Sequence, residues 1–274
     1  MLQQMEDKDP DETDSSKIKR LALVTMKNGD EYTVVITQRD SVQLTITSNG
    51  VEIRLNVQQI KKTEYYDTNE EFTYPNPHPS RYFFCPSAIP LASGTGYYRN
   101  LMLTTISVFF GIGNHFTLGI GMELISSLFG RPTFFISPKW ATKVAKNFHL
   151  GFGALGIALL NRSFGNRMNG IGFALATYGT NDDHMTMGIG ITNRAGEFGK
   201  NPAFTFSGQV RAGNNIGIMT ENYFFISENQ KNYLGIYGVR LMSRKNAFDI
   251  GLLVSKDISQ IIPALPFVGY SRKF

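Results

Sequence analysis

Over the C-terminal two thirds of the chain, bulky apolar residues fall on every second position, and glycine or polar residues stand between them. Seven segments show this pattern: TLGIGMEL (117–124), HLGFGALG (149–156), NGIGFALA (169–176), TMGIGITN (186–193), NIGIMTEN (215–222), YLGIYGVR (233–240) and DIGLLVSK (249–256). A two-residue period is that of a β-strand, whereas a helix repeats every 3.6 residues. Because only short turns separate the segments, the pattern predicts an antiparallel up-and-down β-barrel.

The barrel is expected over residues 97–274, with eleven recognisable strands. They lie near 97–110, 115–127, 132–144, 147–160, 168–179, 184–194, 202–212, 215–226, 232–243, 246–255 and 265–274. Single-chain bacterial barrels nearly always have an even number of strands. Either residues 81–90 supply a twelfth strand, or one predicted strand is part of its neighbour. We expect twelve strands, with ten as the alternative.

The two faces of the predicted strands differ in a way that indicates which one points outward. In the segment 115–124, one face carries Phe116, Leu118 and Ile120, and the other carries Thr117 and Gly119. Small and polar residues cannot fill a dry interior in a barrel this wide, so the bulky face is predicted to lie outside. An all-β protein of this kind is a transmembrane barrel, because the outer face then meets lipid.

Five charged residues lie within the predicted strands, on or beside the small-residue face. A charge that points into hydrocarbon costs about 2–4 kcal/mol near the midplane of a bilayer, so these side chains should point into the lumen. We expect them to pair there as a network that braces the barrel, or to form a filter that selects ions or solutes. The residues are Glu123, Arg211, Glu221, Arg240 and Asp249.

Upstream of the barrel the sequence divides into three parts. Residues 1–17 are acidic and polar and are expected to form a disordered tail. Residues 18–65 predict a small β-domain with strands near 18–26, 31–38, 41–47 and 51–55, and turns at Asn28 and Asn49. Residues 66–96 hold five of the prolines and predict a stiff linker that runs along the barrel. The predicted core of the small domain is Val34, Ile36, Val42, Leu44, Ile46, Ile53, Leu55 and Ile60.

Composition and motifs exclude several classes of function. The net charge is +5, but basic and acidic residues are mixed, which argues against a nucleic-acid partner. No apolar run is long enough for a membrane helix. His78, His115, His149 and His184 lack metal-ligand spacing, and Ser126, Ser127 and Ser207 lack a nucleophile motif. We therefore expect no catalytic residue, metal or cofactor, and no enzyme.

Two parts of the sequence resemble known families. The strings NPHPSRYFFCPSA (76–88), GTGYYRN (94–100) and SPK (137–139) resemble motifs of an uncharacterised family of outer-membrane-type barrels in Bacteroidota, over residues 76–274. In that family SPK is a turn, and no activity is assigned. The segment 18–65 resembles the small Sm-like or SH3-like barrels, which bind RNA, peptides or nothing, so that no function follows from it.

Together these patterns predict a protein of the bacterial outer membrane that contacts lipid and other envelope proteins. Its role would be that of a scaffold, an accessory subunit or a narrow pore. The alternative is a soluble lipocalin-like barrel that binds an apolar ligand, with its bulky face inward. The first residues do not resemble a secretory signal, and the single Cys85 excludes an internal disulfide. The terminal Phe274 resembles the insertion signal of outer-membrane barrels.

Overall fold

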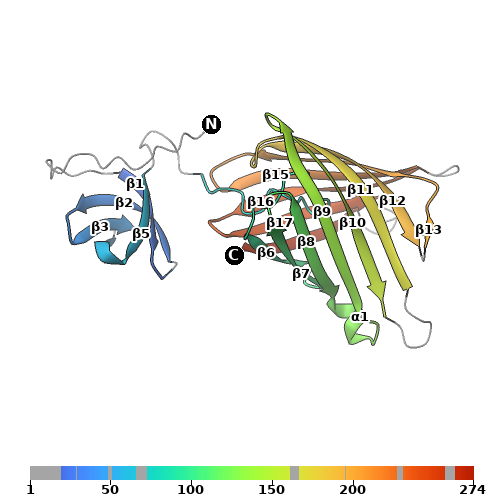
Figure 1. Ribbon diagram of the computed structural model, residues 1–274, viewed down its shortest axis with the longest axis horizontal. Helices are drawn as coiled ribbons and strands as arrows, with labels where there is room; N and C mark the ends of the chain where they lie inside the picture. Colours follow the sequence, from blue (N-terminus) through green and yellow to red (C-terminus); the bar gives the residue numbers. More distant parts are fainter. Residues whose placement is uncertain are drawn as a thin grey trace. The chain divides into compact units, whose positions relative to one another are not determined.

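The computed structural model describes residues 20–28, 30–48, 51–65, 73–160, 167–194, 196–226, 231–256 and 263–274. The chain forms two compact units, residues 1–72 and residues 73–274 (Figure 1). The predicted tail of residues 1–17 and the turn at residues 49–50 lie outside the described residues. Among the described residues, no helix has the length and apolar character that a membrane crossing requires.

The first unit is a five-stranded antiparallel sheet in the order β4-β3-β2-β1-β5. Each of the four predicted strands is present, and the segment after them adds a short 3-10 helix and a fifth strand that pairs with β1. The elements are β1 (Arg20–Met26), β2 (Glu31–Arg39), β3 (Gln43–Ser48), β4 (Val51–Asn56), η1 (Val57–Gln59) and β5 (Ile60–Tyr65).

Most of the predicted core of this unit is confirmed. Val34, Ile36, Leu44 and Ile46 are buried, and Leu55 and Ile60 pack against them. Val42 and Ile53 were wrongly assigned to the core, since both are exposed. Val42 lies in the turn before β3, and β1 fills the core instead. The β1 residues concerned are Ala22, Val24 and Met26.

The second unit is a closed antiparallel barrel of twelve strands, as predicted. Each strand pairs with its neighbours in sequence, β18 pairs with β6, and β12 also carries the two-residue strand β13 (Glu197–Phe198). The wall strands are β6 (Gly96–Leu101), β7 (Thr105–Ile112), β8 (Phe116–Glu123), β9 (Thr133–Ala145), β10 (Phe148–Leu159), β11 (Arg167–Gly179), β12 (His184–Arg194), β14 (Ala203–Arg211), β15 (Ile216–Ile226), β16 (Lys231–Met242), β17 (Asn246–Ser255) and β18 (Leu265–Lys273).

The twelfth strand does not come from residues 81–90. It arises because the segment predicted as one strand, 97–110, divides into β6 and β7. The division occurs at Met102 and Leu103, whose positive φ angles of 52° and 62° turn the chain. Likewise the strand predicted over 115–127 ends at Glu123, where the short helix α1 (Leu124–Leu128) begins.

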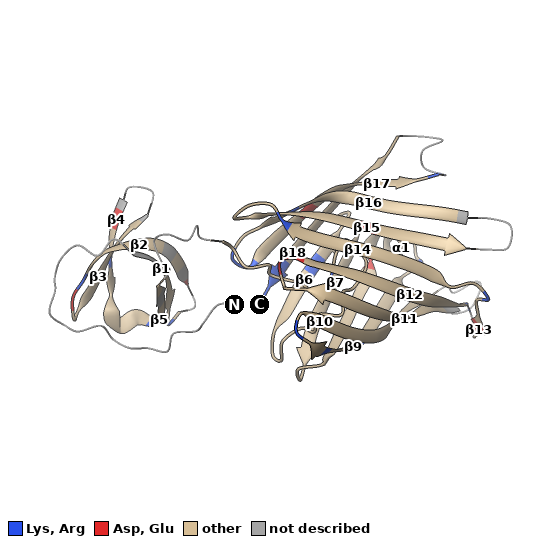
Figure 2. Ribbon diagram, turned by 90° about the horizontal axis from the view of Figure 1, so that it is seen from above, with Lys and Arg blue, Asp and Glu red and all other residues tan. Residues whose placement is uncertain are grey.

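The bulky face of most wall strands points outward, as the sequence predicts. Met187, Ile189 and Ile191 of β12 are exposed, while Thr186 on the opposite face is buried. The same holds for Phe248 and Ile250 of β17. This contradicts the lipocalin-like alternative, which requires the bulky face to point inward. The wall strands also have long uncharged stretches (Figure 2).

The two rims of the barrel differ. At one rim the strands are joined by turns of two to four residues, at 113–115, 146–147, 180–183, 212–215 and 243–245. Phe274 pairs with Gly96 at this short-turn rim. The opposite rim carries α1 and the strand pair of β12 and β13.

Candidate functional site: the closed lumen

The lumen on the short-turn side is occupied by the protein's own residues 73–92, here called the plug. The sequence predicts a linker over 66–96, but residues 73–96 belong to the compact unit of the barrel. Tyr82, Phe83 and Ser87 are completely buried, although the plug forms no regular strand. A proline-rich segment without strand periodicity therefore folds into the lumen, where its backbone requires hydrogen-bond partners.

The plug enters at the short-turn rim and then folds back on itself. The amide of Tyr74 donates to the carbonyl of Asn214, in the turn between β14 and β15. Farther along, the amide of Ser87 donates to Ser80 O, and that of Tyr82 donates to Cys85 O. These contacts form a narrow loop inside the barrel, with Phe83 and Phe84 at its tip.

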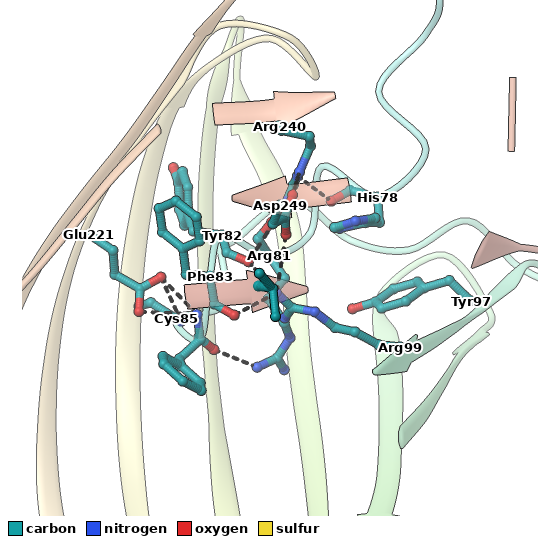
Figure 3. Close-up of polar contacts among 12 residues, drawn as sticks. His78, Arg81, Tyr82, Phe83, Cys85, Tyr97, Arg99, Glu221, Arg240 and Asp249 are labelled. Carbon is teal, nitrogen blue, oxygen red and sulfur yellow. Dashed lines mark hydrogen bonds and ion pairs between the residues drawn. The ribbon is translucent and has the colours of Figure 1, made fainter. Parts of the chain in front are cut away.

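Three cationic side chains of the wall hold the carbonyl groups of the plug. Figure 3 shows two of them, Arg99 and Arg240. Arg240 of β16 donates to the carbonyl oxygens of His78, Arg81 and Tyr82 at 3.2–3.4 Å.

Arg99 of β6 donates to Tyr82 O at 2.9 Å and to Phe83 O. Lys139 of β9 donates to Ser87 O at 2.7 Å, Ile89 O at 3.0 Å and Ser80 O at 3.4 Å.

Arg240 and Arg99 share one carboxylate. Asp249 of β17 forms two hydrogen bonds with Arg240, at 2.7 Å to Nε and 3.1 Å to Nη2, and a third contact of 3.4 Å with Arg99. All three side chains are almost completely buried. The carboxylate balances part of the positive charge and fixes both guanidinium groups at the positions from which they donate to the plug.

Glu221 of β15 holds the amide groups at the tip of the plug. Its carboxylate accepts hydrogen bonds from the amides of Phe84, at 2.9 Å, and Cys85, at 3.0 Å, and from the Tyr223 hydroxyl at 2.6 Å. Figure 3 shows Glu221 and Arg99 on opposite sides of this tip. Wall cations thus bind plug carbonyls, and a wall carboxylate binds plug amides.

Uncharged side chains of the wall also contact the plug. The Tyr82 hydroxyl shares a 2.8 Å hydrogen bond with Thr186, and the Ala88 amide donates to Thr177 at 2.7 Å. Phe83 packs edge-on against Phe267 of β18, with 5.1 Å between ring centroids. A side chain at Gly251 would approach the Phe83 ring, so that glycine leaves room for it.

Two ionisable plug residues are neutral at physiological pH. Burial, with the charges of Arg240 and Arg99, holds the pKa of His78 well below its ordinary value. Burial, with the charge of Glu221, raises the pKa of the Cys85 thiol to about 12. A neutral ring and a protonated thiol add no charge to the plug, which is held by its backbone.

The structure brings together three of the five predicted lumen charges: Glu221, Arg240 and Asp249. Arg240 and Asp249 pair with each other, but Glu221 binds plug amides and no arginine.

Glu123 is not in the network, because its carboxylate caps the first turn of α1 through the amides of Ile125 and Ser126. Arg211 is not in it either, since it pairs with Asp182 at the short-turn rim.

Phe274 lies at the short-turn rim, where its ring packs against Phe110 at 5.8 Å between centroids and is exposed. Its role as an insertion signal stays a prediction.

Sequence reasoning missed Arg99, Lys139 and the plug itself. All three lie at least in part in the strings that carry the family resemblance: residues 76–88 form most of the plug, and GTGYYRN contains Arg99. SPK is not a turn but part of β9, and it contains Lys139. These strings could have indicated the site, because they contain the residues that meet inside the lumen.

The predicted absence of a metal site can be compared with the structure only in the described residues. No group of three histidine, cysteine, aspartate or glutamate residues there could hold a metal ion. His115, His149 and His184 each lie at the beginning of a strand or just before it.

Comparison with known proteins shows similarity in fold only. No family model matches the sequence, and no curated protein matches it. Among solved structures, the KdgM porin is similar with a TM-score of 0.50 and 10% identity, over 66% of this chain and 99% of that chain. The NanC porin is similar with a TM-score of 0.42 and 11% identity, over 65% of this chain and 96% of that chain. The similarity to the KdgM porin shows that the barrel of this chain has a porin-like fold.

Proposed function

We propose that this chain is a non-enzymatic protein of the bacterial outer membrane whose lumen is closed by its own plug. It acts as a scaffold or an accessory subunit of an envelope complex, and the small N-terminal β-domain is its partner-binding part. The observation that carries this proposal is the set of buried wall charges that bind the plug backbone: Arg99, Lys139, Glu221 and Arg240.

The outer wall supports the membrane location. Large apolar side chains are exposed around the barrel, among them Phe152, Met187, Ile218 and Phe248. Soluble monomers rarely expose a continuous apolar surface of this kind. A bilayer covers such a surface, and the closed barrel leaves no unpaired strand edge inside it.

A closed lumen fits a scaffold better than a pore. The plug carbonyls and amides would lose their partners if the plug left the barrel, and the wall would retain unpaired buried charges. Each hydrogen bond to a charged group contributes about 1.5–3 kcal/mol. Release of the plug thus requires many such bonds to break together.

In this proposal the small domain is the part of the chain that a partner binds. It has its own core, and the chain continues from it into the plug. Its kinship with Sm-like or SH3-like barrels, and the membership of the barrel in the Bacteroidota family, are proposals that depend on sequence resemblance alone.

Conductance in planar bilayers tests the closed lumen. We expect the full chain, and a variant without residues 1–65 that keeps the plug, to show no large steady conductance. A variant without residues 1–92 should show one. A large, stable conductance of the full chain would contradict the scaffold and favour the narrow pore.

Purification tests the membrane location separately. The chain should fractionate with membranes and require detergent. A clear monomer in detergent-free buffer would contradict the membrane proposal.

A further inference from the structure

The imidazole of His78, in the plug, is completely buried between the plug and the wall. Its ring stacks on Tyr97 of β6, with 5.2 Å between the ring centroids. Among the described residues, neither ring nitrogen has a hydrogen-bond partner. Most buried polar groups of proteins do have one, so this imidazole is held in its site by packing and not by its own polar atoms.

The charges that act on this ring are positive. Arg240 of β16 donates to the carbonyl oxygen of His78 itself at 3.4 Å, a bond drawn in Figure 3. Arg99 of β6 and Arg81 of the plug repel a charged imidazole in the same way. The carboxylate of Asp249 is bound to Arg240 and contacts Arg99. The surroundings therefore accept a neutral imidazole and oppose a cationic one.

Protonation of His78 inside the barrel would be unfavourable for two reasons. It would add a positive charge beside Arg240 and Arg99, and it would create a ring with two N–H donors. Burial and the charges of the arginines therefore hold the pKa of the seated His78 well below 6.5. In water an imidazole has an ordinary pKa of about 6.5. The seated plug thus excludes a proton that a released plug binds.

We propose that His78 makes the closure of the barrel sensitive to acid: the plug is seated at neutral pH, and its release is favoured as the pH falls below about 6.5. Above that value His78 is neutral in both states, and seating is most stable. Below it, each pH unit favours the released plug by up to about tenfold, because release takes up a proton. The inference rests on the closed lumen of the proposed function, but not on the scaffold role.

Hydrogen exchange of plug amides in the folded full chain, held in amphipol, tests this. The amides of Tyr82 and Ser87 report on release, because they donate to carbonyls within the plug. Their exchange rates, divided by the intrinsic rates at each pH, give the ratio of released to seated plug. Between pH 7.5 and pH 5.0 this ratio should rise about 30-fold in the natural chain and less than about threefold in His78→Gln.

His115→Gln is the matched control. His115 is exposed at the same rim, where its ring stacks on Trp140, and its replacement should leave the acid response unchanged. His78→Met and His78→Lys form a second pair, one neutral and one charged at both pH values. At the higher pH, His78→Lys should release the plug at least about tenfold more often than His78→Met, because its charge is buried without a partner. Heat-modified migration on gels shows that each variant is folded.

Two outcomes would overturn the role of His78. One is an acid response that persists in His78→Gln, which would assign it to another group. The other is equal exchange in the natural chain at both pH values. Conductance of the full chain at the higher pH separates this inference from the proposed function. A large, steady conductance there would contradict the closed lumen itself, whereas a closed barrel without an acid response would overturn only the role of His78.

Discussion

The small domain and the barrel use the same alternating pattern of residues in opposite directions. In the small domain the apolar residues point inward, and Val24 and Ile46 have no exposed surface. In the barrel the apolar residues point outward, where Met187 is 61% exposed, and completely buried Arg240 lies inside. A two-residue period thus specifies a strand with two different faces, and the size of the enclosed space decides which face turns inward.

Five strands enclose a space that a few aliphatic side chains fill. Twelve strands enclose a space that the small residues of the wall cannot fill, and the chain supplies the plug instead. Because the plug is irregular backbone, its partners have to be polar side chains of the wall. The charged interior of the barrel follows from this.

The largest expected effect comes from the charged interior. Arg240→Ala should destabilise the barrel by about 3–5 kcal/mol, because it leaves Asp249 buried with the weaker contact to Arg99 and removes the hydrogen bonds to three plug carbonyls. Urea unfolding of the barrel measures this.

Arg211→Ala is the matched control, since Arg211 pairs at the rim with the partly exposed Asp182. It should cost at most about 1 kcal/mol. Equal effects of the two variants would mean that the interior charges do not hold the plug.

The second effect concerns the outer face. Ile189→Arg should lower the stability of the barrel in bilayers by about 2–4 kcal/mol, because it places a charge in hydrocarbon. Thr192→Arg, on the inner face of the same strand near the rim, should fold almost as well as the natural chain. Folding into liposomes, followed by gel migration, compares them, and a reversed order would show that inside and outside have been exchanged.

The third expected effect is smaller and compares side-chain packing in the two units. Ile46→Val removes one methylene from the core of the small domain and should cost about 0.5–1.5 kcal/mol. Ile250→Val, on the outer wall, should cost much less, because it creates no cavity. Thermal unfolding of each unit in the full chain measures both, and similar losses would indicate that the outer wall is packed against protein.

The smallest effect is a pH dependence of the small domain. Hydrogen bonds from the amides of Gln43 and Val42 hold the pKa of Asp40 below its ordinary value of 3.8. The folded state thus releases this proton more readily, and the stabilisation is complete above that value and declines as the pH falls below it. Asp40→Asn should reduce this acid-dependent decline, and an unchanged pH profile would exclude Asp40 as its source.

Much of the fold could be predicted from the sequence. The alternating segments predict eleven strands and the outward face because both depend on local periodicity, and the even strand number of bacterial barrels predicts the twelfth. The division of 97–110 could not be predicted, since Met102 and Leu103 are not typical residues for positive φ angles.

The candidate site was less accessible to prediction. Charge within a strand predicts that Arg240, Asp249 and Glu221 point inward. It does not reveal partners that are backbone groups of an irregular segment. Prolines in residues 73–92 are typical of a linker, and no periodicity distinguishes a linker outside a barrel from a plug inside it. Glu123 was misassigned because a strand end and a helix cap look alike in sequence.

The most direct test of the plug uses the only cysteine of the chain. Cys85 lies inside the barrel, 5% exposed, and burial raises its pKa. In the folded full chain, a membrane-impermeant maleimide should label Cys85 very slowly, and urea should make labelling fast. Ala92→Cys in a Cys85→Ser background is the control, because Ala92 is exposed and should react at once. Labelling of Cys85 in the folded chain as fast as that of the control would contradict a plug inside the barrel.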